Sequence, residues 1–397
     1  MRNTKGVKPL LDLLQRHNIP RWPIVQGRVA DDVMTTLGHF IREVGLNAIL
    51  SVRVGIDQMD NQKHIIYIGQ PDFGVERSVL RGQFKSPYFR ILHRYKVYMY
   101  RTALILGATV AAADLVNEIV AFEGRLAAAV PAPVSNPTKT FRTISLESLE
   151  TALPLVKWTL FLNNILKDTQ LTLDLNDKVV VTDQEYLRRM SLVLKEEPPY
   201  VVVNYIAWRV VQLLGPLSID RLRYAQFRFD RYRYSLVQIQ PLSRQCFDLT
   251  FRYMRFVIGR IIYDRDTQRP IERHAKMQEI ADEVKEAFAI LLDLVDWMSS
   301  ANKNAAIYKL REMKINAGFP LWIRSDTELN EYYSSIPDLR KEEFFVSALQ
   351  VIKAYVTTEL RKLKFIGYRN DFGWVQLQPQ EDPVYQYLGN FIRKHFA

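Results

Sequence analysis

Histidine and cysteine are the side chains that most often bind zinc, and both are scarce and scattered in this sequence. Two histidines four residues apart, as in an H-E-x-x-H pair, place both imidazoles on one helical face. No such pair occurs, and no two histidines are four residues apart. The spacing therefore predicts no zinc site and favours surface histidines or hydrogen-bonded core histidines. The six histidines are His17, His39, His64, His93, His274 and His395.

The single cysteine, Cys246, is followed by Phe247 and lies two residues after Arg244. A neighbouring cation is one feature of reactive thiols, but a lone cysteine beside an aromatic residue is more often part of a core. We therefore favour a core thiol over a nucleophile. With no second cysteine, neither an intramolecular disulfide nor a thiolate zinc cluster can form. The chain also lacks the G-x-x-x-x-G-K-[ST], G-x-G-x-x-G and G-x-S-x-G motifs.

Residues 220–260 have the most unusual composition, with nine arginines among tyrosines and phenylalanines. Guanidinium groups and aromatic faces together can bind single-stranded nucleic acid through charge and stacking. We favour the alternative, a helix pair with aromatic core residues and solvated arginines. In that helix pair, Tyr224 is predicted to lie in the core with Tyr253 nearby. If an anionic ligand does bind here, its contacts are Arg221, Arg223, Arg228, Arg231 and Arg233.

The elements that position these side chains are predominantly helical. Residues 277–298 carry apolar side chains at helical spacing opposite a row of acids, which predicts an amphipathic helix. Ser299 can cap the helix that follows, and Gly318 with Pro320 can end it. The same periodicity predicts three further helices, over residues 198–214, 301–317 and 341–364.

A short β-hairpin is predicted over residues 46–68, because apolar residues alternate on both sides of a polar turn. Three prolines within residues 130–137 exclude helix there and predict a loop. The expected fold is therefore mainly α, with two helical layers joined near residues 130–140 and one small hairpin.

The composition excludes several classes of protein. Of 397 residues, 48% are hydrophobic and 12% aromatic, with 16 glycines and 18 prolines, which excludes a disordered or collagen-like chain. The longest uncharged apolar run, residues 102–113, is too short to span a bilayer, so we expect a soluble chain without a transmembrane segment. A net charge of +11 permits an acidic partner without requiring one. The lack of a secretory segment, a glycosylation sequon and paired cysteines favours a reducing compartment.

Short segments along the chain, none of them specific alone, occur in a specific order. They are Lys8-Pro9-Leu10-Leu11-Asp12-Leu13-Leu14, Val54-Gly55-Ile56-Asp57, residues 65–71, 158–166, Val179-Val180-Val181, Tyr205 to Val211, 291–298, Gly318-Phe319-Pro320 and Leu329-Asn330-Glu331-Tyr332-Tyr333. Together they resemble the neprilysin and endothelin-converting-enzyme family of zinc metallopeptidases. The resemblance implies a multi-helical N-terminal lid domain over residues 1–374, followed by a divergent tail over residues 375–397.

The same resemblance limits the chemistry expected of this chain. The catalytic half of the family, with its H-E-x-x-H pair, third-ligand glutamate and transition-state histidine, has no counterpart here, so no catalytic or metal-binding residue is carried over. Zinc is expected only if a catalytic domain lies beyond Ala397. The family cysteine that pairs with the position of Cys246 also has no counterpart, which implies a free thiol. The family suggests a plasma-membrane or extracellular location, but nothing in these residues supports one, so the localisation stays open.

Three functional hypotheses follow. The first is a non-catalytic or degenerate homologue that binds a peptide or a partner protein. The second is a fragment of an active zinc metalloendopeptidase whose catalytic domain lies beyond residue 397. The third, which we favour least, is a nucleic-acid-binding module that uses residues 220–260. For a lid domain we expect an exposed apolar patch where the family's catalytic half would pack. Residues 384–392 are predicted to form a short amphipathic helix that covers part of it.

Overall fold

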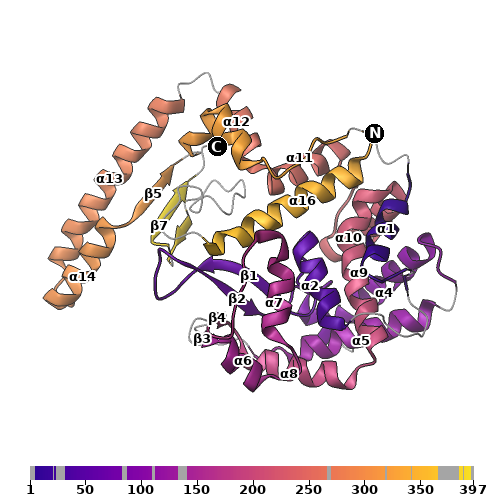
Figure 1. Ribbon diagram of the computed structural model, residues 1–397. Coiled ribbons are helices and arrows are strands. Elements are labelled where there is room, and N and C mark those ends of the chain that lie inside the picture. Colours follow the sequence, from indigo (N-terminus) through magenta and orange to yellow (C-terminus); the bar gives the residue numbers. More distant parts are fainter. Residues whose placement is uncertain are drawn as a thin grey trace. The chain divides into compact units, whose positions relative to one another are not determined.

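The computed structural model describes residues 5–20, 22–23, 32–82, 87–109, 112–132, 141–265, 270–317, 320–340, 342–364, 384–387 and 389–394. The chain divides into two compact units (Figure 1). The first comprises Met1–Gly55, Ile65–Pro241 and Ile336–Lys364, and the second comprises Ile56–His64, Leu242–Ser335 and Phe365–Ala397.

The first unit is built mainly of helices around one small sheet. Its helices are α1 (Lys8–Arg16), α2 (Val33–Val44), α3 (Arg77–Arg81), α4 (Tyr88–Ile105), α5 (Ala112–Ala129), α6 (Leu146–Ala152), α7 (Trp158–Leu166), α8 (Gln184–Glu196), α9 (Pro199–Ser218), α10 (Asp220–Tyr234) and α16 (Phe344–Arg361), with the short 3₁₀ helices η2 (Lys167–Thr169) and η4 (Lys362–Lys364). Local signals explain several boundaries. The Asp32 carboxylate caps α2 by accepting from the amides of Met34 and Thr35, and Gly45, with φ 67°, ends that helix in the left-handed region.

The helix α9 forms the centre of the first unit. Its side chains are buried without a break from Val201 to Val211, and α9 packs against α1, α2, α5 and α10. Among the described residues it is the one helix long and apolar enough to cross a membrane by length and composition. However, 89% of that window is buried inside the protein. A helix that is apolar on every side is typical of a protein core.

A buried polar network connects α4, α5 and α9. The Glu123 carboxylate, which is 0% exposed, accepts hydrogen bonds from the Gly74 amide (2.6 Å), the Tyr95 hydroxyl (2.9 Å) and the Tyr205 hydroxyl (3.3 Å). Arg209 donates to the Tyr205 oxygen at 3.3 Å. Burial raises the pKa of Glu123, although Arg209 and the hydrogen bonds oppose that rise. Because an unpaired buried polar group is costly, these bonds favour one arrangement of the three elements.

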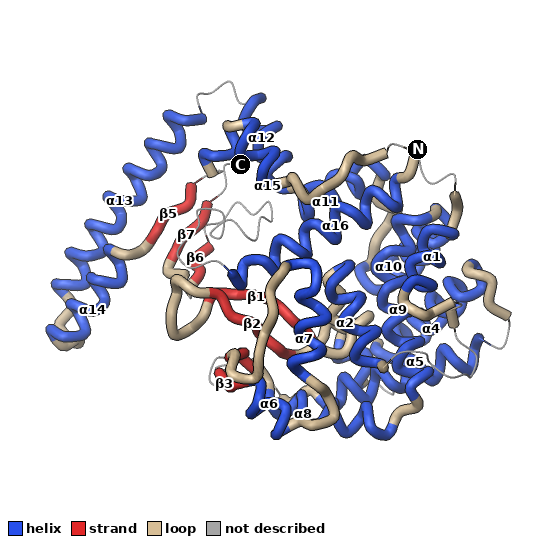
Figure 2. The backbone as a smooth tube through the Cα atoms, in the orientation of Figure 1, coloured by secondary structure: helices blue, strands red, loops and turns tan. Residues whose placement is uncertain are grey.

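Four strands form the sheet of the first unit, in the order β1-β2-β4-β3 (Figure 2). They are β1 (Ser51–Ile56), β2 (His64–Gly69), β3 (Arg142–Ser145) and β4 (Lys178–Val181). The strands β2 and β4 are parallel, with Ile66 opposite Val179, and β3 pairs with β4 antiparallel. The central valines of β4 are fully buried, as expected for an interior strand.

The second unit has a much smaller core. It contains α11 (Leu242–Tyr253), α12 (Arg255–Arg265), α13 (Pro270–Leu294), α14 (Ser300–Arg311), η3 (Leu321–Arg324), α15 (Asp326–Tyr332), β5 (Lys314–Ala317), β6 (Val384–Gln386) and β7 (Phe391–Lys394). The strands form a sheet of order β5-β7-β6, in which β7 is parallel to β5 and antiparallel to β6. Among its described residues, the buried hydrophobic side chains are those of Phe256, Leu310, Ile323 and Phe391.

The mainly helical fold is confirmed, and most of the predicted helices are present. Residues 198–214 lie in α9, 277–298 largely in α13, and 341–364 contain α16. Ser299 caps α14, as predicted, by accepting from the Asn302 amide. The predicted strands at 46–68 are neighbours in the sheet as β1 and β2, but the sequence did not indicate β3 or β4.

Two predictions about the second unit are wrong. The helix predicted over 301–317 ends at Arg311, and residues 314–317 form the strand β5. The amphipathic helix predicted over 384–392 is replaced by β6 and the start of β7. Both errors have one physical cause, because β5 and β7 pair with each other across a long stretch of sequence. The loop predicted over 130–137 lies mostly outside the described residues, and α5 ends just before it.

Candidate functional site

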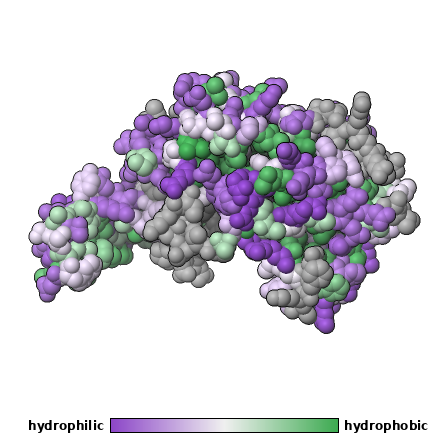
Figure 3. Space-filling model, turned by 90° about the horizontal axis from the view of Figure 1, so that it is seen from below, coloured by the Kyte–Doolittle hydropathy of each residue, from purple (hydrophilic) through white to green (hydrophobic). Residues whose placement is uncertain are grey.

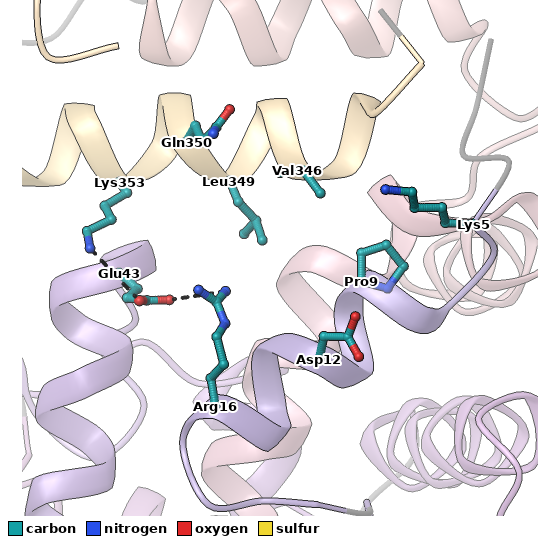
Figure 4. Close-up of a pocket in the computed structure, with 9 residues that line it drawn as sticks. All are labelled: Lys5, Pro9, Asp12, Arg16, Glu43, Val346, Leu349, Gln350 and Lys353. Atoms are coloured by element: carbon teal, nitrogen blue, oxygen red, sulfur yellow. Dashed lines mark ion pairs between the residues drawn. The ribbon is translucent and has the colours of Figure 1, made fainter. Parts of the chain in front are cut away.

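A cavity of about 350 Å³ opens between α1, α2 and α16 in the first unit (Figure 4). In Figure 4 the apolar side chains of Val346 and Leu349 extend into it from α16, and Pro9 faces it from α1. Charged groups of both signs complete the wall. The lining residues are Lys5, Pro9, Asp12, Arg16, Glu43, Val346, Leu349, Gln350 and Lys353.

Helical spacing explains why these side chains meet. On α1 the residues Leu10, Leu13 and Leu14 are buried in the core, and Asp12 and Arg16 lie on the other side of the helix, with the buried Pro9 at the edge of the cavity. On α16, Val346, Leu349 and Lys353 follow one another at three- and four-residue spacing, beside the buried stripe that faces the core. The cavity therefore lies where the outer flanks of these helices face each other.

Glu43 is the most constrained charged group of the cavity. Its side chain is 14% exposed, and its Oε2 lies 3.3 Å from Nε2 of His17 and 3.9 Å from Nη2 of Arg16. The Nζ of Lys353 lies 4.0 Å from its Oε1. Burial alone would raise the pKa of Glu43, but the close contact with His17 and the nearby positive charges outweigh it and lower that pKa. The carboxylate is therefore ionised at neutral pH.

A second carboxylate continues this charge network. The Nζ of Lys353 lies 2.9 Å from Oδ2 of Asp168, and the Nε of Arg42 lies 3.7 Å from the same oxygen. Arg42 also donates to the backbone oxygen of Asn164 at 2.8 Å. At the other end of the cavity, Lys5 pairs with Glu343 at 2.6 Å. The positive and negative charges around the cavity thus neutralise one another, and the apolar side chains form the rest of its wall.

This arrangement can bind a ligand but is not set up to react with one. Separate positive and negative groups suit a small molecule or chain terminus that carries both charges, and the apolar side chains suit an aliphatic group. Nucleophilic catalysis needs a serine, cysteine, threonine or lysine next to a base, and the hydroxyl and thiol residues are missing from the lining. Both lysines of the lining, Lys5 and Lys353, are held in ion pairs.

A second candidate surface lies on α13 in the second unit. Its apolar stripe is exposed rather than buried: Ile280 is 50%, Val284 62% and Leu291 59% exposed. Phe288 of α13 is 49% exposed, and Trp297, just after the helix, is 81% exposed. Figure 3 shows apolar residues in green along the arm that α13 forms with α14. The residues that make α13 amphipathic are therefore open to solvent, and such patches usually mark a contact site.

The comparison with known protein families identifies the chain. The model of peptidase family M13 matches residues 1–320, which is most of its length. The chain belongs to peptidase family M13. The similarity to neprilysin and endothelin-converting enzymes that the sequence segments indicated is thereby confirmed.

Relatives of this M13 chain extend well beyond it. It is 28% identical to Neprilysin-1 of Trittame loki over 372 residues, which is 91% of this chain and 51% of that protein. It is 26% identical to Neprilysin-21 of Caenorhabditis elegans over 96% of this chain and 50% of that protein. The chain thus spans about half the length of the curated relatives it matches.

Solved structures share the fold of this M13 chain. The zinc metalloprotease Zmp1 of Mycobacterium tuberculosis in its open state superposes with a TM-score of 0.78 at 19% identity, over 98% of this chain and 57% of that one. PepO from Lactobacillus rhamnosis superposes with a TM-score of 0.76 at 19% identity, over 99% of this chain and 59% of that one.

The five predicted arginines all lie on α10, but they have two different environments. Arg221, Arg228 and Arg231 are exposed on one face of the helix. Arg223 is 9% exposed, donates to the backbone oxygen of Gln240 and lies 3.8 Å from Asp220. Arg223 is thus a structural residue rather than a solvated one.

Arg233 also has structural contacts. Its Nε donates to Glu76 of the turn before α3 at 2.6 Å, and its guanidinium lies 4.7 Å from the ring centroid of Tyr234. Tyr224 is 50% exposed, so its predicted place in the core is wrong. The buried aromatic residue of α10 is Phe229, which stacks on Tyr98 with 5.5 Å between ring centroids. The sequence pattern did not distinguish Phe229 because aromatic residues occur on every side of α10.

Cys246 and the histidines provide no catalytic centre among the described residues. Cys246 is exposed on α11, so its predicted place in a core is wrong, and its state as a free thiol stays a prediction. His17 and His39 have ring centroids 4.9 Å apart, a contact that their sequence separation did not indicate. Even so, the described residues contain no group of three or more His, Cys, Asp or Glu side chains able to hold a metal ion.

Proposed function

We propose that this M13 chain acts by binding: it is the non-catalytic, peptide-enclosing half of a neprilysin-type protein, and a zinc-bearing half docks on the exposed stripe of α13. In this proposal the chain supplies walls and contacts, whereas the polarising ion and the general base of peptide hydrolysis belong to the other half. The chain would then be inactive alone and would act through a partner.

The observation that carries the proposal is the uncovered apolar stripe of α13. Ile280, Val284 and Leu291 are all half exposed or more, although they are spaced as the core face of an amphipathic helix. Exposing such a stripe to water is unfavourable by about 25 cal/mol for each Å² of apolar surface, so a partner that covers it gains that free energy. Curated relatives are about twice as long as this chain, and their additional half supplies a partner of suitable size.

The first experiment measures zinc and peptidase activity in the purified 397-residue protein. We expect far less than one zinc ion per chain by mass spectrometry, and no chelator-sensitive cleavage of a fluorogenic bradykinin-like peptide. One tightly bound zinc per chain with chelator-sensitive cleavage would overturn the proposal.

The second experiment tests the stripe itself. The triple variant Ile280→Ser, Val284→Ser, Leu291→Ser should bind less of a fluorescent apolar dye and self-associate less than the wild type. A matched variant with Leu155→Ser, Leu160→Ser and Leu192→Ser removes three exposed aliphatic side chains from the first unit. We expect that control to change dye binding less, because its residues do not form one stripe. Equal effects of the two triple variants would contradict a docking role for α13.

The alternative, a fragment of an active zinc metalloendopeptidase, is tested by reading the coding sequence that follows Ala397. An in-frame H-E-x-x-H motif there would favour the fragment. In that case the docking partner of α13 is a later part of the same polypeptide, and the stripe variants should then reduce the activity of the full-length protein.

A further inference from the structure

The helix α4 presents a strongly basic face. Its 18 residues include three arginines, a lysine and a histidine but no aspartate or glutamate. The exposed residues lie on one side of the helix, opposite Tyr95, Met99 and Thr102, which are buried. Two of them are large and apolar, since Phe89 is 59% and Leu104 40% exposed. The exposed residues are Phe89, Arg90, His93, Arg94, Arg101 and Leu104.

The neighbouring helix α10 presents a similar face. Its buried residues, among them Leu222, Ala225 and Phe229, pack inward, and Phe229 contacts Tyr95 and Tyr98 of α4. Several exposed positions follow one another at three- and four-residue spacing on the outer side. The exposed residues there are Arg221, Tyr224, Arg228, Arg231 and Tyr232.

These two faces form one continuous surface. The guanidinium of Arg94 lies over the ring of Tyr232, 4.1 Å from its centroid, and both side chains are exposed. Further along, Tyr98 stacks on Phe229. From the first of these contacts to the second, the residue number rises on α4 and falls on α10. The two helices therefore run antiparallel, side by side (Figure 1). We name the surface the basic face; it contains Arg90, Arg94, Arg101, Arg221, Arg228 and Arg231.

The charges of the basic face are not neutralised within the described part of the chain. No carboxylate among the described residues forms an ion pair with any of its six arginines. Three acids lie near the two helices: Asp220 is beside Arg223, Glu76 accepts from Arg233, and Asp230 of α10 interacts with Arg233 and with Tyr98 of α4. Six arginines without a described ion pair on two adjacent helices repel each other and attract an anionic surface.

We propose that the basic face binds an anionic lipid surface. Lys and Arg near such a membrane attract its headgroups, and exposed apolar side chains add affinity by entering the interface. Phe89 and Leu104 stand on the same side of α4 as its arginines and suit that second role. Single-stranded nucleic acid fits less well, because Arg94 covers the ring of Tyr232 and leaves Tyr224 as the open ring of this surface for base stacking.

The test is sedimentation of the purified chain with vesicles of phosphatidylcholine, with and without phosphatidylserine. We expect binding only to the anionic vesicles, and weaker binding at higher salt. Each basic side chain near such a surface improves partitioning roughly fivefold. The triple variant Arg101→Gln, Arg228→Gln, Arg231→Gln should therefore bind on the order of a hundredfold more weakly.

A matched control separates the basic face from net charge. The variant Arg142→Gln, Lys157→Gln, Lys195→Gln removes three exposed cations from other parts of the first unit, so its net charge equals that of the test variant. We expect nearly wild-type binding from it. Phe89→Ser, which keeps every charge, should lower binding several-fold. Equal losses in both triple variants, binding that ignores phosphatidylserine, or tighter binding to a single-stranded RNA than to vesicles would overturn the proposal.

Discussion

Glu43 and Glu123 are both shielded from solvent, but their pKa values are shifted in opposite directions. Glu43 sits beside His17, Arg16 and Lys353, and these groups lower its pKa despite partial burial. Glu123 is fully buried, and burial raises its pKa even though it accepts three hydrogen bonds. The balance between desolvation and nearby positive charge decides the direction in each case.

Glu43→Gln should change how stability depends on pH. Because the pKa of Glu43 is lower in the folded protein than its ordinary value of 4.5, its ionised form stabilises the fold above about pH 4.5. That contribution is lost as the pH falls through the folded-state pKa. Urea midpoints measured from pH 7 to pH 3 should thus fall more steeply for the wild type than for Glu43→Gln. Glu147→Gln, at an exposed site, is the control and should leave the slope unchanged.

Glu123→Ala should be strongly destabilising. The substitution leaves the Gly74 amide and the Tyr95 hydroxyl without their acceptor, close to the buried cation of Arg209, whereas the Tyr205 hydroxyl keeps the Ala48 carbonyl oxygen at 3.1 Å. Breaking a buried charged network by removing one member typically costs 3–5 kcal/mol, so we expect a loss of about that size. Denaturant titration measures it. A loss below about 1 kcal/mol would show that the network contributes little.

At the scale of one element, α10 combines two roles on opposite sides. Its inner side places Phe229 against Tyr95 and Tyr98, and its outer side carries the exposed arginines. Arg223 belongs with the inner side because it is buried and bonded to Gln240. An aromatic, arginine-rich helix can therefore hold a core and still present a charged surface.

Substitutions on α10 should separate these roles. Phe229→Ala removes a buried aromatic ring and should lower the free energy of unfolding by roughly 3–5 kcal/mol. Tyr224→Ala removes an exposed ring and should stay within about 0.5 kcal/mol. Thermal or urea unfolding of the two variants gives the comparison. Similar losses for both would mean that Tyr224 packs in the core after all.

At the scale of the whole molecule, the two units differ in how much apolar surface they bury. The first unit surrounds α9, whose side chains are almost all buried. Among the described residues of the second unit, four hydrophobic side chains are buried, and none of the described residues of α13 is. Hydrophobic burial is the main favourable term in folding, so stability should be distributed unequally.

Hydrogen exchange should reveal that inequality. In the intact chain, backbone amides of α9 should exchange slowly, at a rate set by unfolding of the first unit. Amides in the middle of α13 should exchange at least tenfold faster, because few buried contacts oppose local opening. Mass spectrometry of peptides from residues 199–218 and 270–294 measures both in one experiment. Equal protection of the two helices would contradict an unequal distribution of stability.

The sequence by itself determined the helical class, the positions of α9, α13 and α16, and the family of the chain. These properties depend on local periodicity, caps and short motifs, which are readable along the chain. Tertiary structure alone decided that β5 pairs with β7, that Tyr224 and Cys246 are exposed, and that Arg223 is buried. It also brought Glu43 and Lys353 to one cavity from opposite ends of the chain. Each of these outcomes depends on which side of a helix or strand is covered by another segment. Contacts between residues far apart in the sequence determine which side is covered.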